Sequence, residues 1–313
     1  MFAARGAGIS LAVFVLLYVP ASLLVSRMWR LLRCALNLRS ARQSVDFLFV
    51  LRILPFALAL VFTLVFTLPS FLLLEPRSTD ENIGTLPILL GAACLLLLLA
   101  GTIRTTAAQR RSSRAITQWL DGSALMEPCS TVPVFRTGKN APGLTVAGVR
   151  DPKVLVSEAA VAALTAAELR TALQHEMAHV RFYDNLKKLI FRLSAFPGMG
   201  GLESAWLEEA ELAADDAAVS SLAEALDLAA ALIKVSRLSP VVCAAELTTG
   251  LLHSSTALGR RVQRLCSWQR IPYVPGRGWF YILPPAAATL FAVVVSYSSA
   301  LDRLHALTEW LVR

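Results

Sequence analysis

Long apolar runs dominate the N-terminal part of this chain. Three of them contain no charged residue: Gly8 to Ser26, Ile53 to Leu74 and Asn82 to Ile103. Each run has about the 20 residues that an α-helix needs to cross a hydrocarbon core about 30 Å thick. We therefore expect three transmembrane helices. The first should be retained, because its run is long for a cleaved signal peptide.

The remainder of the chain follows a different pattern. Residues 116–270 lack an apolar run of membrane length, and a fourth such run covers Gly278 to Ala300. The pattern predicts three spans and a basic loop in 1–115, a soluble domain in 116–270, and a fourth span with a short tail in 271–313. The expected fold class is a mainly α membrane protein with four transmembrane helices, whose soluble α+β domain is inserted between the third and fourth spans.

Arginines are distributed unevenly around these runs. The stretch from Arg27 to Arg42 has no acidic residue and interleaves arginines with apolar residues, as in an amphipathic helix on a membrane surface. Arginines also follow the third run from Arg104 onward, whereas the link from Glu75 to Glu81 carries more acid than base. Basic loops stay in the cytoplasm, so we expect a cytoplasmic soluble domain and external termini.

Composition supports a membrane protein. Of 313 residues, 56% are hydrophobic and 17% charged, and the mean hydropathy is +0.58. The net charge of +8 comes without a basic and aromatic nucleic-acid motif, so we expect membrane lipids, and no nucleic acid, as direct partners. The five cysteines are scattered and suggest a reducing compartment.

The soluble part contains a motif of metal chemistry. His175, Glu176 and His179 form the pattern His-Glu-x-x-His, after a capping-box pattern at Thr165 and Glu168 that predicts a helix. Helical positions four apart share a face, so both imidazoles can bind one zinc ion. Glu176 can then act as general base on a water at the metal. The same pattern also occurs by chance without zinc, which is the alternative for the motif alone.

A second helix is expected from Leu202 to Ser220, after a glycine-rich break. On it Glu211 and Asp215 lie four apart on one face. Glu211 can complete a zinc site, while Asp215 can bond the far nitrogen of a ligating histidine. A solvated acidic face is the alternative, because Glu208, Glu209 and Asp216 are close by.

Residues Val132 to Val156 are rich in Val, Pro and Gly, with alternating runs at Leu144 to Val149 and Val154 to Val156. This pattern predicts a small sheet. In a protease an edge strand of that sheet could hold a substrate backbone. A sheet that only supports the motif helix is equally compatible with the pattern.

The segments 154–157 (Val-Leu-Val-Ser), 175–185 and 211–216 (Glu-Leu-Ala-Ala-Asp-Asp) resemble the BlaR/MecR-type membrane metallopeptidases, the antirepressor proteases of bacterial β-lactam sensing. The resemblance implies a zincin-like (gluzincin) domain in the bacterial inner membrane. It also implies one zinc ion held by His175, His179 and Glu211, with Glu176 catalytic. Asp215 corresponds to the acid after the third ligand.

The resemblance has a clear departure. The sensors of that family carry an extracellular penicillin-binding domain after the fourth span, and this chain stops at Arg313. We therefore expect a relative without that sensor, which cleaves a cytoplasmic or membrane protein, with a transcriptional repressor as one candidate. An HtpX/CAAX-endopeptidase-like quality-control protease and a non-catalytic membrane scaffold are the alternatives. A homo-oligomer is compatible with the sequence. Tyr183 and His253 are both candidates to stabilise the oxyanion of the reaction, and neither is assigned that role.

Overall fold

The computed structural model describes most of the chain. The described residues are 2–32, 40–76, 84–126, 132–138, 142–194, 196, 198–238, 248–250, 255–269 and 297–308. Contacts between Cα atoms divide the chain into two compact units. The first comprises Met1–Arg30, Ile53–Leu99 and Ile271–Arg313, and the second comprises Leu31–Arg52 and Ala100–Arg270.

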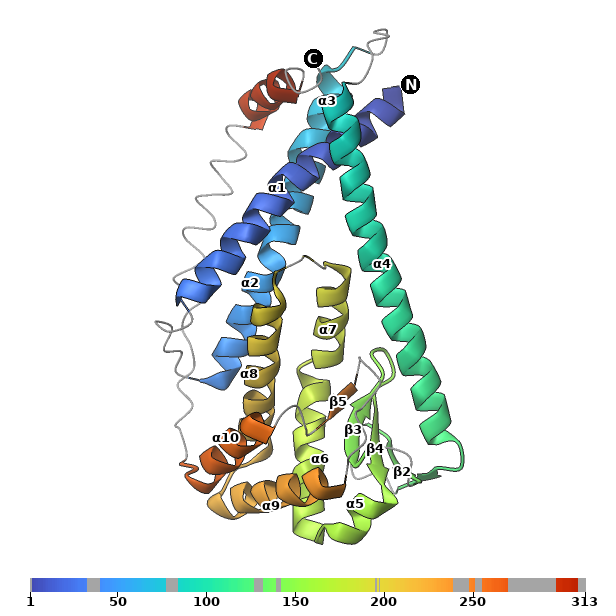
Figure 1. The fold of residues 1–313 in the computed structure, drawn as a ribbon, viewed down its shortest axis with the longest axis vertical. Helices are drawn as coiled ribbons and strands as arrows, with labels where there is room; N and C mark the ends of the chain where they lie inside the picture. Colours follow the sequence, from blue (N-terminus) through green and yellow to red (C-terminus); the bar gives the residue numbers. More distant parts are fainter. Residues whose placement is uncertain are drawn as a thin grey trace. The chain divides into compact units, whose positions relative to one another are not determined.

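Long apolar helices make up the described part of the first unit (Figure 1). The helices are α1 (Phe2–Leu32), α2 (Ala41–Phe62), a π-helical segment (Thr63–Thr67), α3 (Leu68–Leu74) and α4 (Thr85–Leu120). The part of α2 up to Arg52 and the part of α4 from Ala100 onward belong to the second unit. Three helical stretches are long and apolar enough to cross a membrane: Phe2–Trp29, Ala41–Leu74 and Thr85–Leu120. The expected three membrane-length helices are thus confirmed. Of the expected fourth span, residues 278–296 lie outside the described residues.

One end of the first unit is tied by polar contacts. Arg5, near the start of α1, forms a 2.9 Å ion pair with Glu75, just after α3. The hydroxyl of Ser70 donates to the carbonyl of Leu301 at 3.0 Å. The beginning of α1, the end of α3 and the C-terminal residues around Leu301 therefore lie together within this unit.

The second unit contains the small sheet that the sequence predicts. Its strands are β1 (Ala124–Leu125), β2 (Val134–Thr137), β3 (Leu144–Ala147), β4 (Lys153–Ser157) and β5 (Thr248–Gly250), in the order β1-β2-β4-β3-β5. Strands β2 and β4 are parallel, and the other pairs are antiparallel. Strand β3 lies between β4 and β5, so β1 and β5 form the sheet edges.

Helix α6 is the centre of the second unit. The helices are α5 (Glu158–Ala163), α6 (Ala166–Arg181), α7 (Asp184–Leu193), α8 (Gly200–Ala218), α9 (Leu222–Leu238) and α10 (Ser255–Cys266). Helix α6 packs against α8, α9 and β3, which places it between the sheet and the other helices (Figure 1). Buried side chains such as Val154, Leu228, Leu232 and Leu265 form the core around it.

The first part of α2 belongs to this second unit and is held by Arg52. The Arg52 side chain, 1% exposed, donates to Oε1 of Glu203 in α8 at 2.7 and 2.9 Å. It also donates to the carbonyl oxygens of Phe191 and Ser194 at 3.3 and 3.1 Å. Carbonyls at a helix C-terminus lack intrahelical partners. Arg52 therefore caps α7 and ties α2 to α8.

Candidate metal centre

Helix α6 carries the two histidines of the motif. Its first turn is closed by the predicted capping box: the backbone N–H of Glu168 donates to Thr165 Oγ1, and the backbone N–H of Thr165 donates to Glu168 Oε2. His175 and His179 follow on one face, and both are buried. Their Nε2 atoms lie 3.2 Å apart. The helix thus directs two imidazole nitrogens at one point.

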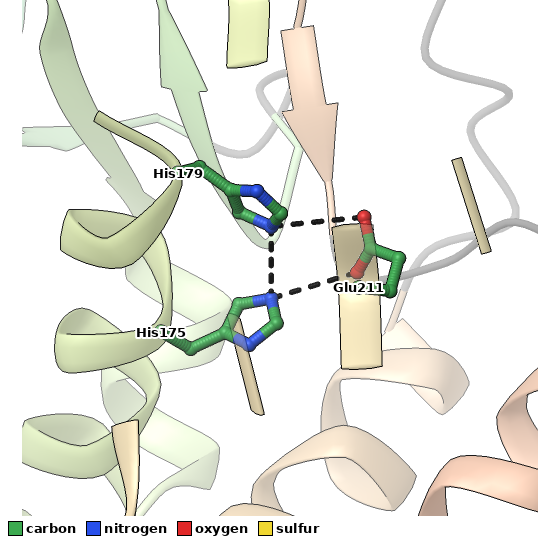
Figure 2. Close-up of side chains that lie close together, drawn as sticks. All are labelled: His175, His179 and Glu211. Carbon is green, nitrogen blue, oxygen red and sulfur yellow. Dashed lines mark hydrogen bonds and ion pairs between the residues drawn. The ribbon is translucent and has the colours of Figure 1, made fainter. Parts of the chain in front are cut away.

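Glu211 comes to this point from α8, which packs on α6. Its Oε2 lies 3.5 Å from Nε2 of His175, and its Oε1 lies 3.6 Å from Nε2 of His179 (Figure 2). A tetrahedral zinc ion with ligand bonds of about 2.0–2.1 Å separates its ligand atoms by roughly 3.3 Å. The buried group of His175, His179 and Glu211 could therefore hold a metal ion.

Two aspartates contact the outer nitrogens of the histidines. Oδ1 of Asp215 in α8 lies 2.9 Å from Nδ1 of His175. Oδ2 of Asp184 in α7 lies 2.7 Å from Nδ1 of His179. An acid at Nδ1 favours the tautomer that carries its proton there, which leaves the Nε2 lone pair for a metal. Both imidazoles could therefore present Nε2 to a metal ion.

The turn at Tyr183 brings Asp184 into place. Tyr183 has left-handed backbone angles, φ 55° and ψ 37°, and is the only described residue other than glycine with positive φ. This residue interrupts the helix between the end of α6 and the start of α7 (Figure 1), and Asp184, the first residue of α7, contacts His179. Left-handed geometry costs a non-glycine residue roughly 1–2 kcal/mol. The fold keeps this strain beside the histidines.

Glu176 is fully buried next to His175. Neither of its carboxylate oxygens has a side-chain hydrogen-bond partner among the described residues. Burial raises its pKa, while the charges of His175 and His179 and the backbone of Val146 act in the opposite direction. A buried carboxylate with so few polar contacts is costly for a fold. Such an acid next to three possible ligand side chains fits a site built for a metal and a water.

Basic side chains balance the buried acids. Arg261 of α10 donates to Glu211 Oε2 at 2.9 Å and to Asp215 at 2.6 and 2.8 Å. Burial raises the pKa of Glu211, but Arg261 and the histidines hold that pKa well below its usual range. Lys188 of α7 is also buried, which lowers its pKa although Glu211, Asp184 and Glu176 oppose the shift. In the same site Asp215 and Glu211 raise the pKa of His175 to about 9 against the effect of burial.

The sequence did not point to Arg261 or to the contact between Asp184 and His179. A signal for Arg261 exists: with Leu258 and Leu265 it falls at helical spacing on the apolar stripe of α10, where an arginine needs a buried partner. Of the residues considered for an oxyanion, Tyr183 is 68% exposed. His253 lies outside the described residues.

No protein-family model matches this sequence, and a search of curated proteins finds no match either. The chemistry that the site can perform follows from its own residues. Two imidazoles and one carboxylate are a ligand set typical of catalytic zinc, which keeps a further position for water. Carboxylate and imidazole also suit other divalent transition metals, so the ligand set alone does not select zinc.

Proposed function

We propose that this chain is a membrane-bound zinc metalloendopeptidase of the BlaR/MecR type, with His175, His179 and Glu211 as ligands of one zinc ion. One observation carries the proposal. Beside the buried ligand group lies Glu176, buried as well and without a side-chain hydrogen-bond partner among the described residues. A structural zinc site has no need of such an acid, whereas a hydrolytic site needs a base there.

The roles of the protein groups follow from this geometry. When bound, zinc would polarise the peptide carbonyl and lower the pKa of the attacking water toward about 7. Glu176 accepts the proton of that water and passes it to the leaving amine. Asp215 and Asp184 keep Nδ1 of the two imidazoles protonated and their rings fixed. Burial of these groups keeps their charges from being screened by solvent.

The membrane setting is part of the proposal. The metal domain takes a zincin-like form, lies in the cytoplasm of a bacterial cell and is anchored in the inner membrane by four spans, with external termini. The three membrane-length helices support this setting, as does the arginine pattern from Arg27 to Arg42. The substrate is a cytoplasmic or membrane protein, with a transcriptional repressor as one candidate.

Comparative proteomics tests the proposal. Cells that express the wild type are compared with cells that express Glu176→Gln, and with a matched Glu209→Gln control on α8. We expect new protein N-termini in the wild type and the control that are absent in Glu176→Gln. Purified Glu176→Gln should keep its zinc and lose at least about 100-fold in cleavage rate. Equal cleavage products in all three strains would refute the assignment of Glu176 as the base.

A further inference from the structure

Helix α10 brings a buried guanidinium to the ligand group. The side chain of Arg261 is 5% exposed. Its Nε and Nη2 donate to the two oxygens of Asp215 at 2.8 and 2.6 Å, and its Nη1 donates to Oε2 of Glu211 at 2.9 Å. One planar group therefore engages both acids that α8 contributes to the site. Charge-assisted contacts of this kind fix orientation as well as distance.

The rest of α10 holds Arg261 in this position. Leu258, Val262 and Leu265 pack into the core that includes α9. On the outer side Arg260 pairs with Glu208 at 3.0 Å, and Arg264 pairs with Asp216 at 2.7 Å. These two outer pairs are partly exposed and contribute little on their own. Arg261 is the member of this arginine group that reaches the metal ligands.

Arg261 reaches a second ligand through Asp215. Oδ1 of Asp215 accepts from Arg261 and also lies 2.9 Å from Nδ1 of His175. The guanidinium thus orients Glu211 directly and His175 through one carboxylate. A displacement of α10 would therefore disturb both ligands together.

The contact with Glu211 has a consequence for coordination. A carboxylate can bind a metal through one oxygen or through both. In this site both oxygens face the histidines, with Oε2 3.5 Å from Nε2 of His175 and Oε1 3.6 Å from Nε2 of His179. Oε2 also accepts a charged hydrogen bond from Arg261 at 2.9 Å, which competes with a metal for the electrons of that oxygen. We propose that Arg261 is a positioning residue that restricts Glu211 to one-oxygen ligation and so keeps a position at the metal for water. This inference rests on the proposed function, because it requires a metal at the site.

Cobalt substitution tests this role without any activity assay. The full-length chain in detergent is loaded with Co²⁺ as wild type, as Arg261→Lys and as the matched control Arg264→Lys. Lysine keeps the charge but has no planar fork, so it cannot hold Glu211 and Asp215 in one geometry. In Arg261→Lys we expect the intense visible bands of four-coordinate Co²⁺ to weaken, as two-oxygen ligation by Glu211 raises the coordination number. Zinc affinity, measured against a chelating dye, should fall about 10–100-fold. The control should match the wild type.

The possible outcomes separate the two proposals. If the wild type binds neither Co²⁺ nor Zn²⁺, both the proposed function and this inference are overturned. If the wild type binds both metals but Arg261→Lys has the same spectrum and zinc affinity within twofold, only the role of Arg261 is overturned. If Arg261→Lys loses its helical circular dichroism, two other variants replace it: the single variant Asp215→Asn, and the double variant that combines Asp215→Asn with Arg261→Gln. The double variant removes one negative and one positive charge, so the net charge of the site does not change. A weaker four-coordinate spectrum in the double variant than in Asp215→Asn supports the inference, and identical spectra overturn it.

Discussion

Asp184 lies 2.7 Å from His179 although α6 has already ended between them. This contact links the first turn of α7 to a proposed zinc ligand. It makes the α6–α7 turn part of the site rather than a simple connection.

Asp184→Ala should weaken zinc binding by about 10–100-fold, because the His179 ring would lose the acid that fixes its tautomer. The matched control is Asp227→Ala on α9, an element that supplies no residue to the site. Zinc affinity is measured by competition with a chelating dye on both purified variants. Unchanged affinity in Asp184→Ala would show that the contact does not orient the ligand.

The left-handed turn at Tyr183 predicts an order of stability between two substitutions. Glycine accepts positive φ without strain, whereas a β-branched residue there is an outlier. Because Tyr183 is 68% exposed, either substitution loses little packing. Tyr183→Gly should therefore be more stable than Tyr183→Val by about 1 kcal/mol or more. Thermal unfolding in detergent measures the difference, and a higher melting temperature for the valine variant would argue against the turn geometry.

The start of α6 predicts a pH dependence of stability. Both oxygens of Glu168 accept from Nζ of Lys234, at 2.8 and 2.7 Å, and Oε2 also accepts from the backbone N–H of Thr165. Burial would raise the pKa of Glu168, but these contacts lower it below its usual value of 4.5. The folded state thus favours the carboxylate more than the unfolded state does. Its stabilising effect is complete above about pH 5 and is lost as the pH falls through the lowered pKa.

Glu168→Gln removes this effect, since an amide does not titrate. The variant should lose roughly 1 kcal/mol at pH 7, and its stability should change less than that of the wild type between pH 6 and about pH 3. Unfolding curves followed by circular dichroism at several pH values provide the comparison. Parallel losses of stability in both proteins on acidification would contradict this role of Glu168.

The proposed topology predicts which side of the membrane each segment faces. Two variants each keep a single cysteine, all other cysteines being serines. The cysteine introduced at Ser78 in the first variant should react with a membrane-impermeant thiol reagent in intact cells. The native Cys266 in the second variant, which is exposed in the second unit, should react only after the membrane is permeabilised. The reverse labelling pattern would invert the orientation inferred from the arginines.

The local part of the site could be predicted from the sequence, because its geometry is a property of single helices. His175 and His179 share a face through their spacing, the capping box marks the start of α6, and Glu211 follows on the next long helix that the glycine-rich break allows. These relationships need only helical periodicity and one reversal of the chain.

The contacts that cross between elements could not be predicted in this way. Arg261 is separated from Glu211 by all of α9, and its partner depends on how α10 packs on α8. Arg52 immediately precedes the apolar run Ile53 to Leu74, and nothing local in the sequence shows that it is buried against α7 and α8. The break between α6 and α7 uses backbone angles at Tyr183 that its residue type does not favour, so no local rule predicts the contact of Asp184 with His179.

The zinc content of the purified full-length chain tests the central claim most directly. The wild type, Glu211→Ala and Glu209→Ala are purified in detergent, treated with a mild chelator and measured by atomic emission. The proposed site predicts about one zinc per chain in the wild type and in Glu209→Ala, and close to none in Glu211→Ala. Zinc retained in Glu211→Ala, or absent from the wild type, would contradict a metal centre formed by His175, His179 and Glu211.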